Sequence, residues 1–467
     1  MRLSEFEGRS VAVWGYGREG RAALSVLTQK FPAERFTLFC SEAEAAALIA
    51  QSSDLFAREA GGRGTRVLVV TTPVDEAVLA AFDIVVKSPG ISPYREPHLS
   101  AEHMGVRFTS GTAIWFAEHA KARTICVTGT KGKSTVAALI AHLLRKSGRL
   151  TALAGNIGLP LLDLLEPAHE PDWWVIELSS FQARDFEGAP TVALINNLYE
   201  EHLDWHVTSE NYSKDKLRIA AKAQRVVVNA RQKKLVDLGQ WNLNDAFNHF
   251  DGWHLRDCAV WRGNEEVLAS RQIPLPGEHN ALNVCAALAA IEAAGEDARA
   301  LARHVATFKP LPHRLQHLGI RGGIDYVNDS ISTTPYAAIE ALRSLDGRTT
   351  TILVGGFDRG IDWQPFADFV ARRPPHAVVT MGTNGDAIAA VLARLAHRGF
   401  ELASAHALAD AFARALSLTP EDGAILLSPG APSFDQFNDY AERGREFARL
   451  AGFDPAAIMQ VEGLGIA

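Results

Sequence analysis

The residues with the clearest capacity for chemistry form a stretch rich in glycine and lysine, GTKGKST, at positions 129–135. An apolar stretch typical of a buried strand, TICVTG, precedes it, and a helical pattern, STVAALIAHLLRKSG, begins within it. Backbone N–H groups of such a turn and the positive end of the helix form a site for phosphate. We therefore expect Lys133 to reach the β- and γ-phosphates of a nucleotide and the Ser134 hydroxyl to ligate Mg²⁺. Val127 replaces the first glycine of the common motif, and a tight turn that happens to contain lysine is the alternative.

A second glycine turn, GYGREG at positions 15–20, follows the apolar stretch SVAVW and precedes the helical run RAALSVLTQK. This order opens many nucleotide-binding βαβ units. The acidic residue expected about 20 residues further on is poorly placed, because Ser41 and Glu42 follow the next apolar stretch. An NAD site and a turn that only packs the helix therefore both stay open.

Two further side chains follow apolar stretches downstream of the first motif. Glu177 ends WWVIE, and a carboxylate at the carboxyl end of a parallel strand faces the crevice where ligands bind. Oxygen ligands suit Mg²⁺. His202 lies in NNLYEEHLDWH, and its place after a phosphate motif and a carboxylate favours a functional role over the usual structural one. The segment NYSKDKLRI, which contains Lys216, reads by itself as a solvated charged helix.

The elements that must position these residues repeat one pattern. Strand-like and helical stretches alternate in three cycles, which predicts three α/β domains with largely parallel sheets. A length of 467 residues agrees with about three domains at about 150 residues each. We predict an N-terminal Rossmann-like domain over residues 1–111, a central ATP-binding domain over 112–311 and a C-terminal Rossmann-like domain over 312–467. The stretch KPLP at 309–312 is the expected linker, because its prolines interrupt helix and sheet.

Composition narrows the class of protein. Apolar residues make up 47% and charged residues 22%, the balance of a soluble globular protein, and the formal charge of −7 disfavours a nucleic-acid partner. The four cysteines form no CxxC pair and indicate reduced thiols rather than disulfides or a metal site. The charged N-terminus and the lack of a long apolar run predict a cytoplasmic protein without membrane insertion. Nothing predicts self-association, so a monomer is expected.

Eight motifs in one order resemble the Mur ligase family. They are GTKGKST, ELSSFQ, NLYEEHLDWH, YSKDKLRI, GEHNALN, LPHRLQ, NDSISTTP and LLSPGAPSFDQF, and GYGREG with SPGI extends the match to the N-terminus. Each motif is weak to moderate alone, whereas the ordered set is specific. The forms ELSSFQ and SFDQF are most similar to the glutamate-adding branch of the family.

The resemblance implies a role for each matching position. The positions that match contacts to a UDP-sugar substrate are Gly15, Gly17, Arg18, Glu19, Gly90, Asn156 and Ser179. Those that match the ATP site are Gly129, Thr130, Lys131, Gly132, Lys133, Ser134, Thr135, Asn280, Asn283, Arg314 and Asp329, with His313 beside them. Those that match catalytic groups are Lys133, Glu177, His202, Lys216 and Arg314. Those that match metal ligands are Ser134, Glu177, His202 and, if carbamylated, Lys216. Those that match the glutamate pocket are Thr333, Arg359, Ser433 and Tyr440.

The resemblance also implies a reaction, the ATP-dependent addition of glutamate to UDP-N-acetylmuramoyl-L-alanine during synthesis of a peptidoglycan precursor. The substrate carboxylate would attack the γ-phosphate to give an acyl phosphate, which the glutamate amine would then attack. Two Mg²⁺ ions, Lys133 and Arg314 would neutralise the repelling anions. Closure of the third domain would exclude water from the intermediate.

The chain departs from the family pattern in the glutamate pocket. Ile331 replaces the lysine of NDSKAT, Arg359 replaces a lysine after the glycine pair, and Tyr440 replaces a phenylalanine. Arginine and lysine are not equivalent toward carboxylates, because arginine offers a planar fork. We therefore favour L-glutamate as the added amino acid, with D-glutamate as the alternative.

Three other functions stay in view. A folylpolyglutamate synthase would share the phosphate loop and a glutamate co-substrate, but it would not need the domain that precedes this loop. A nucleotide-binding protein without turnover would not need Lys133, Glu177, His202 and Lys216 together. An NAD-dependent dehydrogenase would rest on GYGREG alone and would leave the phosphate motif unexplained.

Overall fold

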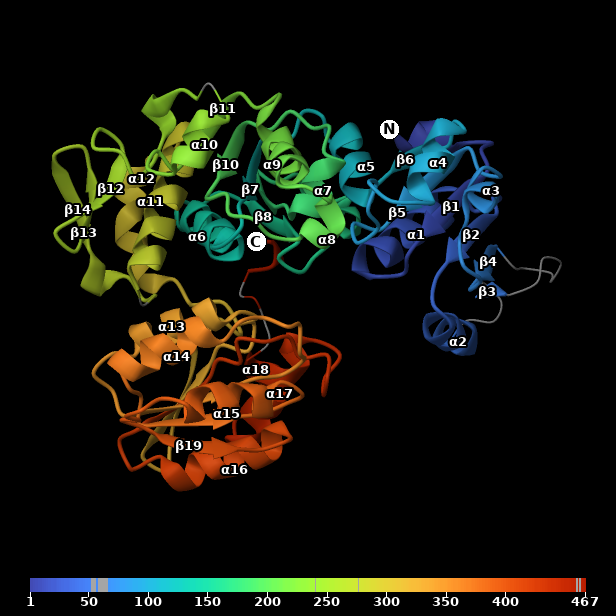
Figure 1. Cartoon of the computed structure of the whole chain (residues 1–467). Helices are drawn as coiled ribbons and strands as arrows, with labels where there is room; N and C mark the ends of the chain where they lie inside the picture. Colours follow the sequence, from blue (N-terminus) through green and yellow to red (C-terminus); the bar gives the residue numbers. More distant parts are fainter. Residues whose placement is uncertain (52–55, 58–65, 240, 276, 459–460, 462) are drawn as a thin grey trace. The chain divides into compact units, whose positions relative to one another are not determined.

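The structure, a computed structural model, describes residues 1–51, 56–57, 66–239, 241–275, 277–458, 461 and 463–467 (Figure 1). The chain forms two compact units. The first contains Met1–Ile273, Asn280–Phe308 and Gly463–Ala467, and the second contains Pro274–His279 and Lys309–Glu462. Among the described residues, no helix combines the length and apolar character that crossing a membrane requires.

The first sheet of the first unit is wholly parallel, with six strands in the order β3-β4-β2-β1-β5-β6. Its strands are β1 (Val11–Trp14), β2 (Phe36–Phe39), β3 (Phe56–Ala57), β4 (Val67–Val70), β5 (Ile84–Lys87) and β6 (Arg107–Thr109). Its helices are η1 (Leu3–Phe6), α1 (Arg18–Lys30), α2 (Glu42–Gln51), α3 (Glu76–Leu79) and α4 (His98–His103). The strand order places the ends of β1 and β5 next to each other, so the loops after these strands share one edge.

The second sheet of this unit also has six strands, in the order β11-β10-β7-β9-β8-β21. Its strands are β7 (Thr124–Thr128), β8 (Thr151–Gly155), β9 (Trp173–Glu177), β10 (Val192–Ile195), β11 (Arg225–Val228) and β21 (Gly465–Ile466). All are parallel except β21, which pairs antiparallel with β8. No sequence pattern predicts this return of the chain end to the first unit.

Helices cover the second sheet and link it to the first. The α-helices are α5 (Gly111–Glu118), α6 (Lys133–Lys146), α7 (Ser180–Arg184), α8 (Leu203–His206), α9 (Ser209–Leu217), α10 (Lys233–Asp237), α11 (Glu278–Ala293) and α12 (Ala298–Ala302). Short 3-10 turns are η2 (Leu161–Leu164), η3 (Arg218–Ala220), η4 (Leu243–Asp245), η5 (Ser270–Gln272) and η6 (Arg303–Thr307). In Figure 1 they run from the cyan to the yellow part of the chain.

A small antiparallel sheet was not predicted. It consists of β12 (Trp253–Arg256), β13 (Ala259–Arg262) and β14 (Glu265–Ala269). Asp257 and Cys258 form the first turn with φ values of 50° and 56°. Such a two-residue turn requires positive φ at both positions, which sequence analysis recognises by Asn-Gly or Asp-Gly, and Asp-Cys lacks that signature.

The second unit contains one six-stranded sheet in the order β15-β16-β20-β17-β18-β19. Its strands are β15 (Gln316–Arg321), β16 (Ile324–Asn328), β17 (Thr350–Val354), β18 (Ala377–Thr380), β19 (Glu401–Ser404) and β20 (Ala424–Leu427). Only the edge strand β15 is antiparallel to its neighbour. The helices are α13 (Pro335–Ser344), α14 (Gln364–Arg372), α15 (Gly385–Ala393), α16 (Leu408–Leu418), α17 (Tyr440–Leu450) and α18 (Pro455–Ile458).

The predicted fold class is confirmed, because three large, mostly parallel sheets alternate with helices along the chain. The exact boundaries at residues 111 and 311 stay a prediction. The strands of the large sheets could be predicted from the sequence because they are continuous apolar runs. Both faces of a parallel sheet are covered, so neither face needs polar residues.

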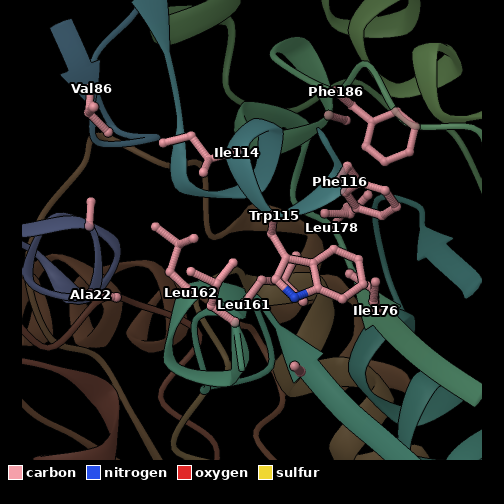
Figure 2. Packing of buried hydrophobic residues seen from close by; sticks show 14 of the residues in the cluster. Ala22, Val86, Ile114, Trp115, Phe116, Leu161, Leu162, Ile176, Leu178 and Phe186 are labelled. Atoms are coloured by element: carbon pink, nitrogen blue, oxygen red, sulfur yellow. The ribbon is translucent and has the colours of Figure 1, made fainter. Parts of the chain in front are cut away.

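A tryptophan on α5 joins the two sheets of the first unit. Trp115 is fully buried, with its ring 4.6 Å from that of Trp174 and stacked 4.5 Å from His119. Figure 2 shows it among side chains of both halves, including Ala22 and Val86 from the first sheet layer and Ile176 from the second. This shared core fixes the loops of the first sheet against those of the second.

Candidate active site

The phosphate loop, Gly129–Thr135, connects β7 to α6. Gly132 is the N-cap of α6 with φ 79°, and Lys133 is the first residue of the helix. The Lys133 ammonium donates to the backbone carbonyl of Thr130 at 3.1 Å, so its side chain folds back over the loop. Ser134 and Thr135 are buried beneath it. The strand, turn and helix that the motif predicted are therefore present, with the helix N-terminus facing the loop.

Amide side chains from two other elements hold the phosphate loop in shape. Asn197 Oδ1 accepts hydrogen bonds from the backbone N–H groups of Thr130 (3.0 Å) and Lys131 (2.8 Å). Asn196 donates through Nδ2 to the carbonyl of Lys131 at 3.0 Å and to Asn283 Oδ1 at 2.9 Å. Both follow β10, the neighbour of β7. Hydrogen bonds from these two asparagines therefore hold the loop in its conformation, in addition to the glycines of the loop itself.

The structure brings the predicted nucleotide contacts of α11 to the same place. Asn283 Nδ2 donates to Asn280 Oδ1 at 3.1 Å, and both residues are buried. Through Asn196 this pair is linked to the phosphate loop. Lys131 points elsewhere, since its exposed side chain forms an ion pair with Glu201. Lys131 therefore contributes its backbone N–H and carbonyl groups to the loop, and its charged side chain pairs with Glu201 instead.

Glu177 is the last residue of β9 and is fully buried next to the phosphate loop. Its neighbour across the ladder is Val127 of β7, two residues before that loop begins. Oε1 accepts a hydrogen bond from Asn156 Nδ2 at 2.7 Å, whereas Oε2 has no hydrogen-bond partner among the described residues. A buried carboxylate oxygen without a partner is costly, so it marks a place for a cation or a donor.

Lys216, on α9, lies under the phosphate loop. Its side chain is 2% exposed, and Nζ donates to the carbonyl of Gly129 at 2.8 Å. Burial holds the pKa of this amine well below its ordinary value, and the positive charge of Lys133 lowers that pKa further. The neutral amine is therefore easier to reach here than in water. The charge pattern of NYSKDKLRI by itself predicted a solvated helix face here. That prediction is wrong for Lys216, which is buried.

His202 caps the short helix α8 in the left-handed region, with φ 56° and ψ 38°. This conformation is strained for a side chain with a Cβ, and such strain gathers at functional sites. Its ring lies against that of Phe181, 5.0 Å away, and half of the side chain is exposed. Partial burial and the charges of Lys216 and Lys133 lower the pKa of His202, while the charge of Glu201 opposes them.

The N-terminal glycine turn meets the second sheet through two side chains. Glu19 is hydrogen-bonded by Gln182 Nε2 at 2.8 Å, and burial raises the pKa of Glu19. Arg18 donates to the carbonyl of Gly158 at 3.2 Å. Gly20 packs so closely that a Cβ there would lie 2.0 Å from the carbonyl oxygen of Gly15, which accounts for the motif by packing alone. Gly17 caps α1.

The other predicted UDP-sugar positions line the same side of the first unit. Ser179 caps α7, where it forms a capping box with Gln182. Asn156 follows β8 and contacts Glu177, so the predicted sugar and metal positions touch. The carbonyl of Gly90 accepts a hydrogen bond from Trp205 Nε1 at 3.0 Å. All these residues come from loops at the carboxyl ends of parallel strands, where open α/β sheets bind ligands.

In the second unit, Asp329 follows β16 and is deeply buried. Its Oδ2 accepts a hydrogen bond from Ser428 at 2.7 Å and its Oδ1 accepts one from the Leu315 N–H at 3.2 Å. Burial raises the pKa of Asp329 to about 7, and the charge of Arg314 counteracts this. His313 has φ 63°. Its Nδ1 accepts a hydrogen bond from Asn328 Nδ2 at 3.1 Å and lies 3.0 Å from Ser330 Oγ, and burial lowers the pKa of His313 to about 4.

The predicted glutamate positions follow three neighbouring parallel strands of this unit. Thr333 comes after β16, Ser433 after β20 and Arg359 after β17. Ser433 is buried, whereas Arg359 is exposed. Tyr440 begins α17 with its ring 5.8 Å from that of His313. The structure therefore gathers these residues at one edge of the sheet.

Several residues of the site received no role from the sequence. Asn196 and Asn197 were part of a recognised stretch but received no role. Tyr212 OH lies 2.7 Å from Thr130 Oγ1 of the phosphate loop, and Arg443 is buried with its guanidinium on the carbonyls of Ser330, Ala431 and Pro432. Asparagine directly after a buried strand was the only available signal.

The donors present suit Mg²⁺ better than a transition metal. In the described part of the chain, no cluster of three or more His, Cys, Asp or Glu side chains is arranged to hold a metal ion. Glu177 offers an oxygen without a partner, and a serine hydroxyl follows Lys133. Mg²⁺ typically takes one or two carboxylates and keeps several waters, so this sparse set fits it.

Comparison with known proteins agrees with this geometry. Residues 127–291 match the family described as the Mur ligase middle domain. The chain is 50% identical over its whole length, and over the whole length of the relative, to a UDP-N-acetylmuramoyl-L-alanine–L-glutamate ligase of Xanthomonas campestris pv. campestris. It is 39% identical to the enzyme of the same name from a Micromonospora strain, with 96% of this chain and 97% of the relative covered.

A solved structure shares the fold. The UDP-N-acetylmuramate-alanine ligase MurC of Thermotoga maritima matches 95% of this chain and 99% of its own chain with a TM-score of 0.59 and 18% identity. At this identity the likeness concerns the fold alone.

Proposed function

The chain belongs to the Mur ligase family, and from that premise we propose that it joins L-glutamate to UDP-N-acetylmuramoyl-L-alanine while ATP is cleaved to ADP and phosphate. The ATP-dependent formation of an amide bond to glutamate, as a step of peptidoglycan synthesis, follows from the family. The L configuration, the role of each residue and the use of Mg²⁺ are parts of the proposal.

One observation of the geometry supports the proposal most strongly. The buried amine of Lys216 touches the phosphate loop at Gly129. Burial lowers its pKa, the charge of Lys133 lowers that pKa further, and the charges of Glu201 and Glu177 oppose this, so these groups share one electrostatic site. Buried groups with perturbed pKa values in a ligand crevice are typical of catalytic sites. A phosphate loop that only bound a nucleotide would not need a buried amine and a carboxylate oxygen without a partner beside it.

We assign the phosphate loop and Lys133 to the phosphates of ATP, with Asn280 and Asn283 placed toward the nucleoside. Ser134, Glu177 and His202 would hold Mg²⁺, which supplies charge neutralisation between the phosphates and the attacking carboxylate. Lys216 would join this set as a carbamate, because its neutral amine is the form that adds CO₂. Family members are expected to use two ions, and that number stays part of the proposal.

The reaction then proceeds in two steps. In the first step a carboxylate oxygen of UDP-N-acetylmuramoyl-L-alanine attacks the γ-phosphorus, the bond to the β-phosphate oxygen breaks, and ADP leaves. Lys133 holds the phosphates, and Arg314 would stabilise the charge that develops on the transferred group. In the second step the amine of glutamate attacks the acyl carbon, the amine loses a proton, and phosphate leaves.

We place glutamate at Thr333, Arg359, Ser433 and Tyr440 of the second unit. Arg359 offers two parallel N–H donors to a carboxylate, whereas a lysine offers a point charge. This change, together with Ile331 in place of a lysine, redistributes positive charge around the two carboxylates of glutamate. The relatives that match over their whole length carry L-glutamate in their names, which supports the same choice here.

The test measures phosphate release from ATP in the presence of UDP-N-acetylmuramoyl-L-alanine, with L-glutamate or D-glutamate in separate reactions. Release that requires L-glutamate is expected. Release with D-glutamate alone would overturn the stereochemical assignment and keep the ligase. Release with neither amino acid would remove the substrate assignment.

Two variants on one helix sharpen the same assay. Lys133→Ala, at the first position of α6, should abolish release, and Lys146→Ala, at the exposed last position, should leave it unchanged. Equal activity of both variants would show that Lys133 does not act on the phosphates. The cytoplasmic location, the monomeric state and the three domain boundaries predicted from the sequence remain part of the proposal.

A further inference from the structure

A buried carboxylate on α9 connects three elements of the first unit. Asp215 is 1% exposed, and its two oxygens have separate partners. Tyr94 OH donates to Oδ1 at 2.8 Å, and His206 Nδ1 lies 2.8 Å from Oδ2. The other ring nitrogen of His206 lies 3.0 Å from Ser180 Oγ. Arg184 Nε also lies 3.6 Å from Oδ1, so this buried carboxylate is held by two hydrogen-bond partners and a nearby cation.

The loop that supplies Tyr94 also holds the backbone of α8. This loop, Ser88–Arg95, follows β5 of the first sheet. Ser92 Oγ donates to the carbonyl of Trp205 at 2.6 Å, and Arg95 Nη2 donates to the carbonyl of Asp204 at 2.7 Å. A helix of one turn has few internal N–H donors for its carbonyls, so such external donors stabilise it. The helix they hold is the one that His202 begins.

Another face of α9 contacts the phosphate loop. Tyr212 OH lies 2.7 Å from Thr130 Oγ1, and Lys216 Nζ donates to the carbonyl of Gly129 at 2.8 Å. Residues four apart share a helix face, so Tyr212 and Lys216 point the same way, while Asp215 is rotated by about 100°. One turn of α9 therefore touches the phosphate loop on one side and the Ser88–Arg95 loop on the other.

We propose that Asp215 is a positioning residue, and that Tyr94, Asp215 and His206 couple the binding of the UDP-sugar substrate to the binding of nucleotide. The inference rests on the proposed function, in which the loop around Gly90 holds the UDP-sugar. A substrate that orders this loop orients Tyr94. Tyr94 then fixes Asp215, and with it Lys216 and the helix that begins at His202. Nucleotide bound at the phosphate loop orders the same helix from the other side. Each ligand thus binds more tightly when the other is present.

A second contact between the same two sheets provides a matched control. Lys87 of β5 pairs with Asp185, which follows α7, at 2.6 Å, and the Lys87 side chain is 1% exposed. This pair bridges the same parts of the unit, yet Asp185 makes no hydrogen bond or ion pair with α8 or α9 among the described residues. Lys87, which stays unchanged in the control, also donates to the Ile91 carbonyl at 3.4 Å and lies 6.0 Å from the Trp205 ring. Asp185→Asn and Tyr94→Phe each weaken one contact between the two sheets. Only Tyr94→Phe removes a contact to α9.

The experiment measures the dissociation constant of a non-hydrolysable ATP analogue by calorimetry, with and without saturating UDP-N-acetylmuramoyl-L-alanine. The ratio of the two constants is the coupling factor, and it must be the same whichever ligand is added first. The unaltered enzyme should show a factor within the common range of about 5 to 150. Tyr94→Phe should bring it close to one, with each ligand alone binding within about twofold of the unaltered enzyme. Asp185→Asn should keep it.

Asp215→Asn provides a second variant on the other side of the hydrogen bond. It should lower the coupling factor as Tyr94→Phe does, and the double variant should lower it no further, because both changes remove one connection. Full coupling in Tyr94→Phe, or equal loss in Asp185→Asn, would overturn the proposal. Absent coupling in the unaltered enzyme would overturn it as well. Failure of the UDP-sugar to bind at all would instead remove the proposed function.

Discussion

Replacing Gly132 by alanine tests whether the shape of the phosphate loop, rather than its charge, makes the nucleotide site. Gly132 has φ 79°, and a Cβ there would lie 2.5 Å from Asn283 Oδ1 and 2.6 Å from Asn196 Nδ2. These two atoms are hydrogen-bonded to each other at 2.9 Å. The methyl group would therefore separate the amide pair that joins α11 to the loop.

Gly148, just beyond the other end of the same helix, is a matched control. Its φ is 82°, and a Cβ there would meet no atom within 4 Å. Both substitutions incur the left-handed penalty of about 1–2 kcal/mol. Only Gly132→Ala adds an overpacking cost of about 1–3 kcal/mol. We expect the free energy of unfolding to fall by about 1–2 kcal/mol in Gly148→Ala and by about 2–5 kcal/mol in Gly132→Ala.

The assay is chemical denaturation of each variant, with and without ATP analogue at about 100 times the dissociation constant of the unaltered enzyme. Binding at that concentration stabilises a protein by about 2.7 kcal/mol. Gly148→Ala should keep this increment, and Gly132→Ala should lose most of it. Equal destabilisation of the two variants, or an ATP increment that survives in Gly132→Ala, would refute the argument from loop shape.

Three further predictions follow from buried side chains. Trp115→Ala should lower the free energy of unfolding by about 3–5 kcal/mol, measured by urea denaturation, because a fully buried ring is lost; a loss under about 1 kcal/mol would contradict the packing at α5. Burial lowers the pKa of His98 to about 4, whereas the pKa in the unfolded chain is about 6.5. As the pH falls the unfolded state therefore takes up the proton first, so the contribution of His98 to the free energy of unfolding is full above about pH 6.5 and is lost toward pH 4. The difference between the free energies of unfolding at pH 7 and pH 5, measured by denaturation, should be about 2 kcal/mol larger in the unaltered protein than in His98→Gln. Lys216→Met should reduce phosphate release at least about 100-fold while the melting temperature is kept or raised, because a buried amine is replaced by an apolar chain of similar size; a folded variant with full turnover would refute the role of this amine.

The sequence predicted the phosphate loop and the three large sheets because both have short-range physical causes. A parallel strand covered on both faces must be an apolar run, and a loop that cradles phosphate needs glycine where Gly132 has a positive φ. Lys133 and Glu177 were therefore identified from motifs, whereas the two asparagines of α11 were identified through the family resemblance, and the structure places them together.

What the sequence did not predict depends on contacts between distant segments. Tyr94 and Asp215 are separated by 121 positions, and no local pattern indicates that their side chains meet. The pairing of β21 with β8 depends equally on the folded chain. Lys216 was identified only through the family resemblance, because a buried lysine and a solvated one look alike in a charged segment.

The proposed ATP positions of the first unit and the proposed glutamate positions of the second unit differ in how they can change. The ATP half is built largely from backbone, so a change of shape at Gly132 affects the whole loop. The glutamate half is built from side chains on separate loops, and the buried Arg443 ties two of these loops together through the carbonyls of Ser330 and Ala431. Because the buried Arg443 holds these loops, we expect that exposed positions such as Arg359 can be replaced without disturbing the fold. The two enantiomers of glutamate carry the same charges and differ only in arrangement, so in the proposed pocket the positions of such side chains would decide which one is bound. The departures from the family pattern, Ile331, Arg359 and Tyr440, all lie in the stretches that carry the proposed glutamate positions, whereas the pattern around the phosphate loop is kept.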